Sequence, residues 1–156
     1  MDQIARSDDV PLLEAHLGYW LRYVSNQTSH AFAAKLAARG VTVAEWVVLR
    51  ELYDCASLVP SALADRLGMT RGAISKLADR LEAKALAARG ADRDDRRFQT
   101  LALTPAGRAL VPELARLADA NDTEFFGHLA PEDRAGLEAV LRDIVRRKGL
   151  KAIPID

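Results

Sequence analysis

The chain contains 156 residues, of which 49% are hydrophobic, and its 22 basic and 22 acidic side chains give a formal net charge of zero. This composition suits one globular domain with an apolar core, and no apolar run reaches the ~18 residues that would span a membrane. The N-terminus is acidic and lacks the pattern of a signal peptide. The single cysteine, Cys55, excludes a framework of disulfide bonds within the chain. We therefore expect a cytoplasmic protein without a membrane partner.

The charge is unevenly distributed along the chain. Residues 60–108 carry 10 basic and 6 acidic side chains, whereas residues 1–59 carry 5 and 7 and residues 109–156 carry 7 and 9. The central segment is therefore positive by four and each flank is negative by two. This distribution is expected if only the central part of the chain faces phosphate groups.

The first part of the chain predicts two helices. Apolar residues recur at three- and four-residue spacing over residues 12–38, and Gly40 follows the last of them, as is typical of a helix end. Thr42 and Glu45 have the spacing of a capping box, in which each side chain accepts a hydrogen bond from the backbone amide of the other residue. This motif predicts that a second helix covers residues 43–54.

The central segment predicts two short helices joined by a tight turn. Pro60 is favourable at the first position of the third helix, and Gly68 permits a sharp turn after it. Thr70 is a suitable N-cap for the fourth helix. The apolar stripe of the fourth helix consists of Ile74, Leu77 and Leu81.

The third part of the chain changes its hydrophobic period. After Lys84 the pattern predicts strands at residues 86–90 and 98–103, with a charged turn between them. Thr104 and Pro105 then cap and start a fifth helix that extends to about residue 128, and Pro131 starts a sixth.

The first and the last helices predict an interface between two copies of the chain. They are rich in Leu and Ala, and they are too long for the small domain that they could cover. An apolar helix stripe with nothing to pack on in its own chain is typical of a protein interface. We therefore expect residues 10–38 and 109–150 to join a symmetric homodimer, and the tail, residues 153–155, to add to that contact.

The fourth helix has a basic outer face. Its side chains Arg71, Ser75, Lys76 and Arg80 point away from the apolar stripe. Such a helix, placed after a tight turn and before a basic hairpin, has the layout of a DNA recognition helix with a wing. The alternative interpretation is an ordinary solvated helix face, on which charges at this spacing are common.

Four motifs in this order resemble the MarR family of bacterial transcription regulators. They are residues 63–68 (Leu-Ala-Asp-Arg-Leu-Gly), 73–82 (Ala-Ile-Ser-Lys-Leu-Ala-Asp-Arg-Leu-Glu), 95–97 (Asp-Arg-Arg) and 103–107 (Leu-Thr-Pro-Ala-Gly). The resemblance implies a single MarR-like domain over residues 1–156 that is mainly α with a small β-wing. In it, a winged helix-turn-helix at residues 42–108 is flanked by long N- and C-terminal dimerisation helices at residues 10–38 and 109–150. The sequence departs from the family at Ala85, where a Gly is usual, and at Val59, where a polar N-cap is usual.

The resemblance implies that a homodimer binds double-stranded DNA at a near-palindromic operator. Basic side chains of the fourth helix can pair with guanine, and Asp95 is expected to hold the Arg97 guanidinium for entry into the minor groove. The alternative for the wing is a solvated hairpin tip of mixed charge. The predicted DNA-binding residues are Ser61, Thr70, Arg71, Gly72, Ala73, Ser75, Lys76, Arg80, Asp95, Arg96 and Arg97.

Aromatic side chains on the first two helices predict a small-molecule site. Members of the family often bind small aromatic or phenolic acids between the dimer helices and the DNA-binding part, and aromatic walls with one Arg or His suit such a ligand. The candidate ligand-binding residues are His16, Trp20, Tyr23, Trp46 and Arg50. The alternative is that these rings belong to the core, as Trp and Tyr on helical stripes usually do.

Other classes of function have less support. No Gly-rich phosphate loop, nucleophile motif or pair of inward carboxylates indicates an enzyme, and the scattered three His and one Cys predict neither a metal site nor a cofactor. Some members of the family sense peroxide through a cysteine near the N-terminus, but Cys55 follows the second helix, where a lone Cys is usually a small buried hydrophobe. A redox-responsive regulator that uses Cys55, and a winged-helix adaptor without specific DNA binding, are the alternatives to a repressor that an aromatic ligand releases.

Overall fold

The structure is a computed structural model that describes residues 10–92 and 94–155. It is mainly helical, with one small sheet of two antiparallel strands, as the sequence predicts. In chain order the elements are the short 3-10 helix η1 (Leu13–Ala15), α1 (Leu17–Ala37), α2 (Val43–Tyr53), α3 (Pro60–Leu67), α4 (Arg71–Ala83), β1 (Ala87–Ala91), β2 (Gln99–Leu103), α5 (Pro105–Phe126) and α6 (Pro131–Lys148).

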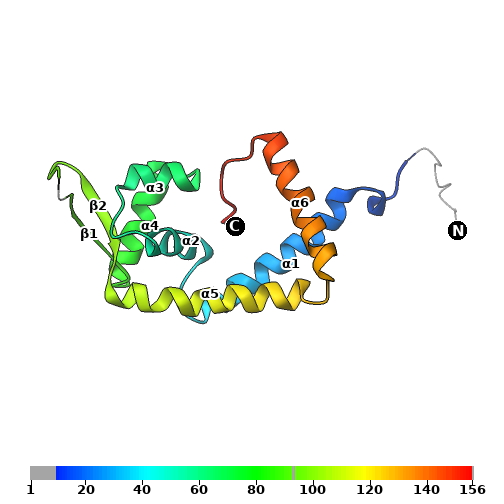
Figure 1. Cartoon of the computed structure of the whole chain (residues 1–156), viewed down its shortest axis with the longest axis horizontal. Helices are drawn as coiled ribbons and strands as arrows, with labels where there is room; N and C mark the ends of the chain where they lie inside the picture. Colours follow the sequence, from blue (N-terminus) through cyan, green and yellow to red (C-terminus); the bar gives the residue numbers. More distant parts are fainter. Residues whose placement is uncertain (1–9, 93, 156) are drawn as a thin grey trace, which may run out of the picture.

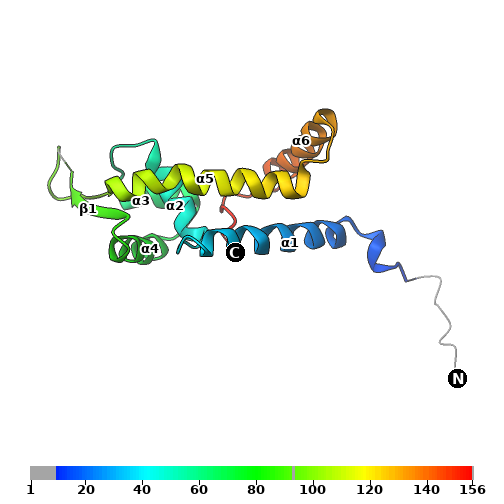
Figure 2. The ribbon, with the colours of Figure 1, turned by 90° about the horizontal axis from the view of Figure 1, so that it is seen from below.

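The elements form a compact module and a helical arm. Helices α2, α3 and α4 gather around the start of α5, and the β1–β2 hairpin projects from this module (Figure 1). Helices α1 and α5 pack along each other and carry the chain away from the module to α6, as both views show (Figures 1 and 2). The module therefore corresponds to the predicted winged helix-turn-helix, and the arm corresponds to the predicted dimerisation helices.

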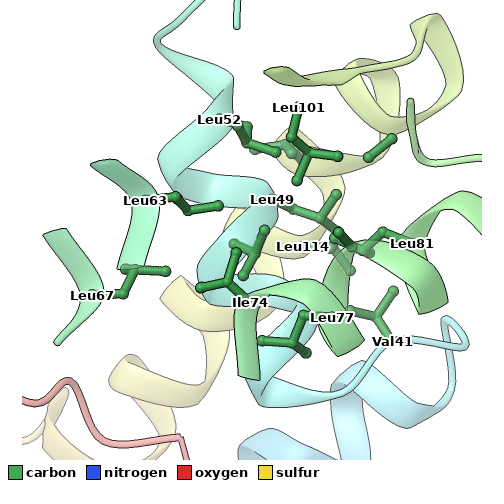
Figure 3. Packing of buried hydrophobic residues seen from close by; sticks show 14 of the residues in the cluster. Val41, Leu49, Leu52, Leu63, Leu67, Ile74, Leu77, Leu81, Leu101 and Leu114 are labelled. Atoms are coloured by element: carbon green, nitrogen blue, oxygen red, sulfur yellow. The ribbon is translucent and has the colours of Figure 1, made fainter. Parts of the chain in front are cut away.

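The core of the module lies between α2, α3, α4, β2 and α5. The predicted stripe of α4, Ile74, Leu77 and Leu81, is buried there (Figure 3). Leucines from the surrounding elements complete the cluster, namely Leu49, Leu52, Leu63, Leu67, Leu101 and Leu114. Because the stripe is buried, the opposite face of α4 must be the outer one.

Three of the helix starts have side-chain caps, as their sequences predict. Thr42 and Glu45 form the complete capping box of α2, Thr70 accepts a hydrogen bond from the Ala73 amide at 3.1 Å, and Thr104 accepts one from the Gly107 amide. The start of α3 differs, because Val59 has no side chain that can cap it. A proline at the first position of that helix removes one of the amides that a cap would satisfy.

The N-terminal helix begins later than predicted. The sequence pattern predicts one helix over residues 12–38, whereas α1 starts at Leu17 and η1 is a separate turn. His16 has extended backbone angles (φ −103°, ψ 126°), and the Trp20 indole N–H donates to the Glu14 carbonyl oxygen at 2.9 Å. That carbonyl is thus bound by a side chain across the break and not by a helical amide.

The C-terminal tail returns to the module in a single chain. The backbone N–H of Ile153 donates to the carbonyl oxygen of Leu67 at 3.2 Å, and the Ile153 side chain packs against the core of the module. The tail passes so close to Gly68 that a Cβ there would lie 2.7 Å from the Ala152 Cα. In one chain, then, the tail covers the α3–α4 turn, and its role in the dimer contact stays a prediction.

A buried carboxylate connects two distant parts of the module. The Glu45 side chain is only 1% exposed, and it accepts hydrogen bonds from the Thr42 amide (3.0 Å) and from Lys84 Nζ (2.7 Å). Lys84 Nζ also donates to the Gly40 carbonyl oxygen at 2.7 Å. The end of α4 is thereby tied to the α1–α2 turn.

The end of α4 also contains a strained residue. Ala85 has φ 57°, a left-handed conformation that costs a residue with a Cβ about 1–2 kcal/mol. The family usually has Gly near this position, and Gly adopts a positive φ without strain, so the departure noted in the sequence places a Cβ on a left-handed residue. The Thr104 hydroxyl donates to the Ala85 carbonyl oxygen at 2.7 Å and helps to hold the turn.

We predict that Ala85→Gly stabilises the protein. Removal of the Cβ relieves the left-handed strain, and the greater freedom of Gly in the unfolded chain offsets part of the gain, so the free energy of unfolding should rise by about 0.5–1 kcal/mol. Urea unfolding at a fixed chain concentration measures this. The matched control is Ala88→Gly on the exposed part of β1, which should destabilise by a similar amount. A lower urea midpoint for Ala85→Gly would contradict the strain.

Candidate nucleic-acid interface

The outer face of α4 presents basic side chains to solvent. Arg71, Ser75 and Lys76 are exposed, and Gly72 has no heavy atom within 4 Å of where a Cβ would lie. Ala73 is half-buried beside them. The first two turns of α4 are therefore exposed, with small residues at the centre and basic side chains at the edges. This arrangement suits close approach to a polyanion.

The two predicted hydroxyl contacts lie near helix N-termini. Thr70 is exposed and already accepts the Ala73 amide, so its hydroxyl hydrogen is left to donate to an acceptor such as a phosphate oxygen. Ser61 is half-buried in the first turn of α3. Both hydroxyls are at ends of helices where free amides favour anions.

Arg80 has a partner within the protein. Its Nε lies 3.7 Å from Glu45 Oε1, so it shares the buried carboxylate with Lys84. Its side chain is still more than half exposed, yet it lies at the end of α4 near the α1–α2 turn. This contact supports a structural role for Arg80 beside the predicted DNA contact, unlike Arg71 and Lys76, for which no ion pair is found among the described residues.

The wing is an antiparallel hairpin, and side-chain hydrogen bonds link the described residues near its tip. Strands β1 and β2 pair in register from Ala87 with Leu103 to Ala91 with Gln99. Asp92 Oδ1 accepts the amides of Asp94 (2.8 Å) and Asp95 (3.4 Å). Arg96 is exposed at this tip, and Arg93 lies outside the described residues.

Asp95 and Arg97 form the contact that the resemblance implies. Asp95 accepts hydrogen bonds from Arg97 Nε (3.0 Å), Arg97 Nη2 (2.7 Å) and the Arg97 amide (3.0 Å). The guanidinium and then the amide lower the pKa of Asp95 from its ordinary value. The contact is therefore complete at neutral pH and is lost only as the pH falls through that lowered pKa. Because the Arg97 side chain is 86% exposed, Asp95 orients a cation that is free to meet another molecule.

One residue that the sequence analysis missed connects the wing with α4. The Arg89 guanidinium contacts the carboxylates of Asp79 and Glu82 and donates to the Ser75 carbonyl oxygen. The signal in the sequence is an isolated Arg among small residues in β1, together with two acidic residues spaced by three on α4. Sequence alone does not pair them, because the hairpin must first fold back on the helix.

The candidate ligand-binding residues do not gather in a single chain. Trp20 and Tyr23 are exposed on α1, where each makes an edge contact with Tyr19 (ring centroids 5.2 and 5.4 Å apart). Trp46 is half-buried on α2 and packs against the core of the module. Trp20 lies in the first turn of α1, at the end of that helix that points away from α2 (Figure 1).

The two polar candidates are also apart from a common pocket. His16 is exposed between η1 and α1. Arg50 forms an ion pair with Asp54 at 2.7 Å and lies over the Tyr53 ring, with 5.9 Å between the guanidinium carbon and the ring centroid. A pocket that includes Trp20 and Tyr23 would need walls from another chain.

The structure also places the residues on which the other predictions depend. Cys55 is half-buried, and its sulfur lies 3.8 Å from Arg66 Nη1. No group of three or more His, Cys, Asp or Glu side chains in residues 10–92 and 94–155 could hold a metal ion. In the same part of the chain, no helix combines the length and the apolarity that crossing a membrane requires.

Comparisons with known proteins agree with this geometry. A model of the MarR family matches residues 39–97. A putative transcriptional regulatory protein for the hcr operon of Thauera aromatica is 30% identical over 139 residues, which are 86% of this chain and 82% of that protein. A transcriptional repressor of the helix-turn-helix type from Mycobacterium bovis is 31% identical over 82% of this chain and 89% of its own length.

Solved structures share the fold over most of the chain. BpsR of Bordetella bronchiseptica, whose DNA binding 6-hydroxynicotinic acid regulates, has a TM-score of 0.75 at 27% identity and covers 86% of this chain and 96% of its own. A mutant of MarR from E. coli complexed with operator DNA has a TM-score of 0.74 at 25% identity and covers 83% and 93%. The chain belongs to the MarR family of winged helix-turn-helix, DNA-binding transcriptional regulators.

Proposed function

We propose that this chain is a homodimeric repressor that binds a near-palindromic operator and releases it when a small aromatic acid binds. The observation that carries the proposal is the pair of cationic surfaces on one module, namely the outer face of α4 and the Arg97 side chain that Asp95 orients. An α-helix fits the major groove, and an Arg suits the negative potential of a narrow minor groove. The two surfaces would therefore bind neighbouring grooves.

The dimer is supported by helices that lack partners in their own chain. No residue of α6 is buried, and α6 makes no extended packing contact with another described element. An open groove of about 830 Å³ lies between α6 and the end of α5, and Leu137, Leu141 and Val145 line it together with Phe126. Exposed apolar patches of this kind mark protein interfaces, and a two-fold pair of arms would cover both copies with the same surface.

The effector is supported by similar proteins and by the exposed rings on α1. BpsR responds to 6-hydroxynicotinic acid, and CouR of Rhodococcus jostii, with a TM-score of 0.75, was crystallised with p-coumaroyl-CoA. On α1, the Tyr19 ring makes edge contacts with the rings of Trp20 and Tyr23. In the dimer, side chains of the second copy would complete a pocket around these rings. A ligand there weakens DNA binding if it binds the DNA-incompetent arrangement of the dimer more tightly.

We predict that Arg71→Ala and Lys76→Ala each weaken specific DNA binding by about 1–3 kcal/mol, the usual loss for a base contact. Arg97→Ala should weaken binding mostly at A·T-rich flanks. Fluorescence anisotropy with a duplex from directly upstream of the coding sequence measures this, and Arg39→Ala, an exposed basic residue in the α1–α2 turn, is the matched control. If all three variants bind like the parent, the interface is misplaced. If the parent itself binds no DNA better than a random duplex, the adaptor alternative holds.

We predict a dimer at micromolar concentration, held by α1, α5 and α6. Leu141→Glu puts a charge into the apolar groove and should give monomers in sedimentation velocity, because the charge would lose its hydration at the interface. Phe98→Glu changes an equally apolar, exposed side chain on the wing and should leave the dimer intact. In the dimer, the two α4 helices should lie about one DNA turn apart, ~34 Å. A monomeric parent protein would defeat this proposal.

We predict that a small aromatic acid changes the fluorescence of Trp20 more than that of Trp46. The chain has two tryptophans, so Trp46→Phe and Trp20→Phe each leave a single reporter. The exposed Trp20 should respond on binding, and Trp46, packed on the core, should respond little. A tenfold loss of DNA affinity needs only ~1.4 kcal/mol of coupling, and operator DNA must then weaken ligand binding by the same factor. If no acid in a broad panel changes either emission or DNA binding, these rings have a packing role.

A further inference from the structure

The Arg89 side chain lies between the wing and the recognition helix. Its Nη1 contacts Asp79 Oδ1 at 2.8 Å and also Glu82 Oε2, and its Nη2 donates to the Ser75 carbonyl oxygen at 3.3 Å. The Arg89 amide donates to Glu82 Oε1 at 3.1 Å. Only 22% of the side chain is exposed, so this planar group is held from several sides.

Arg89 is the residue of β1 that can make such a connection. The other four residues of this strand are three Ala and one Gly, whose side chains form no polar contact. Arg89 pairs with Leu101 in the middle of the hairpin, and the tip with Asp95 and Arg97 follows a few residues further along. The contact therefore links the middle of the hairpin to α4, in addition to the buried Ala87 and Leu101 side chains that fix the base of the hairpin to the core.

We propose that Arg89 is a positioning residue for DNA recognition, which orients the wing so that Arg97 and α4 contact one duplex simultaneously. The inference rests on the proposed function. Two linked contacts reinforce each other only where the geometry lets both form, and a rigid link makes the second contact more probable once the first exists. A guanidinium clamped by two carboxylates and one carbonyl supplies such a link.

Arg89 also neutralises acidic side chains, and the test must distinguish this role from positioning. Asp79 and Glu82 lie on the DNA-binding helix, and Arg89 neutralises them, so its loss would leave negative charge near the phosphates. The two roles differ for Glu82→Gln. This change removes a negative charge and also weakens one of the two carboxylate contacts that hold Arg89. Positioning predicts weaker binding, whereas neutralisation alone predicts tighter binding.

The first experiment is a double-mutant cycle on the upstream duplex, measured by anisotropy. Arg89→Ala should weaken binding about tenfold in the parent, and much less in the Arg97→Ala background, because a misplaced wing without Arg97 has no contact left to lose. In the Lys76→Ala background the full loss should persist, since Lys76 lies on α4 itself. Equal losses in all three backgrounds would overturn the proposal.

The second experiment measures Glu82→Gln and Arg89→Lys on the same duplex. Weaker binding by Glu82→Gln and partial recovery by Arg89→Lys are expected, whereas tighter binding by Glu82→Gln overturns positioning. If Arg89→Ala fails to fold by circular dichroism, the cycle is repeated with Glu82→Gln in its place, with the same two outcomes. If Arg97→Ala alone binds like the parent, the wing contact of the proposed function fails. If Arg97→Ala weakens binding and the cycle is additive, only the role of Arg89 fails.

Discussion

Burial of one stripe of α4 determines what the rest of the module can do. Ile74, Leu77 and Leu81 lie in the leucine core, and full burial of each such side chain contributes about 1.5–3 kcal/mol. A helix of 13 residues with this stripe inside has one remaining face, which carries Arg71, Ser75 and Lys76. No separate interaction is needed to direct the basic face outward, because rotating the helix would expose the stripe.

Polar contacts then fix the positions of the C-terminal end of α4 and of the wing. The buried contact and the exposed contact have different roles. Glu45 is almost fully buried, so removing its partner Lys84 would leave a carboxylate with little access to water, a loss of up to about 3–5 kcal/mol for a fully buried pair. Lys84 is itself 38% exposed, which reduces that figure. The Asp95–Arg97 pair is open to solvent and adds little to stability, so its value is orientation. The module thus has a buried carboxylate that needs its cationic partners and an orienting ion pair at the wing tip.

Local signals in the sequence predict much of this architecture. Thr42, Thr70 and Thr104 cap the helices that their spacing predicts, and the apolar stripe of α4 identifies its inner face correctly. The sequence pattern predicts one unbroken N-terminal helix, whereas the chain breaks before α1 and the Trp20 side chain is bound across the break. The position of the tail within one chain, held by a backbone bond from Ile153 to Leu67, was also not predicted. Periodicity carries no information about such partners, which is also why the Arg89 network was missed.

Two connections link α6 to the helix-turn-helix within one chain. One is α5, which Lys35 fixes to α1 through hydrogen bonds to Asn121 (3.0 Å) and Glu124 (2.6 Å). The other is the tail after α6, which ends on the α3–α4 turn at Leu67 and Gly68. Since α6 is attached to the turn through the tail and to the core through α5, a change in its position must be absorbed by one of them. The tail is held by one backbone hydrogen bond and the packing of Ile153, so it is the part that yields first, and a movement of α6 is absorbed there before it changes the turn before α4.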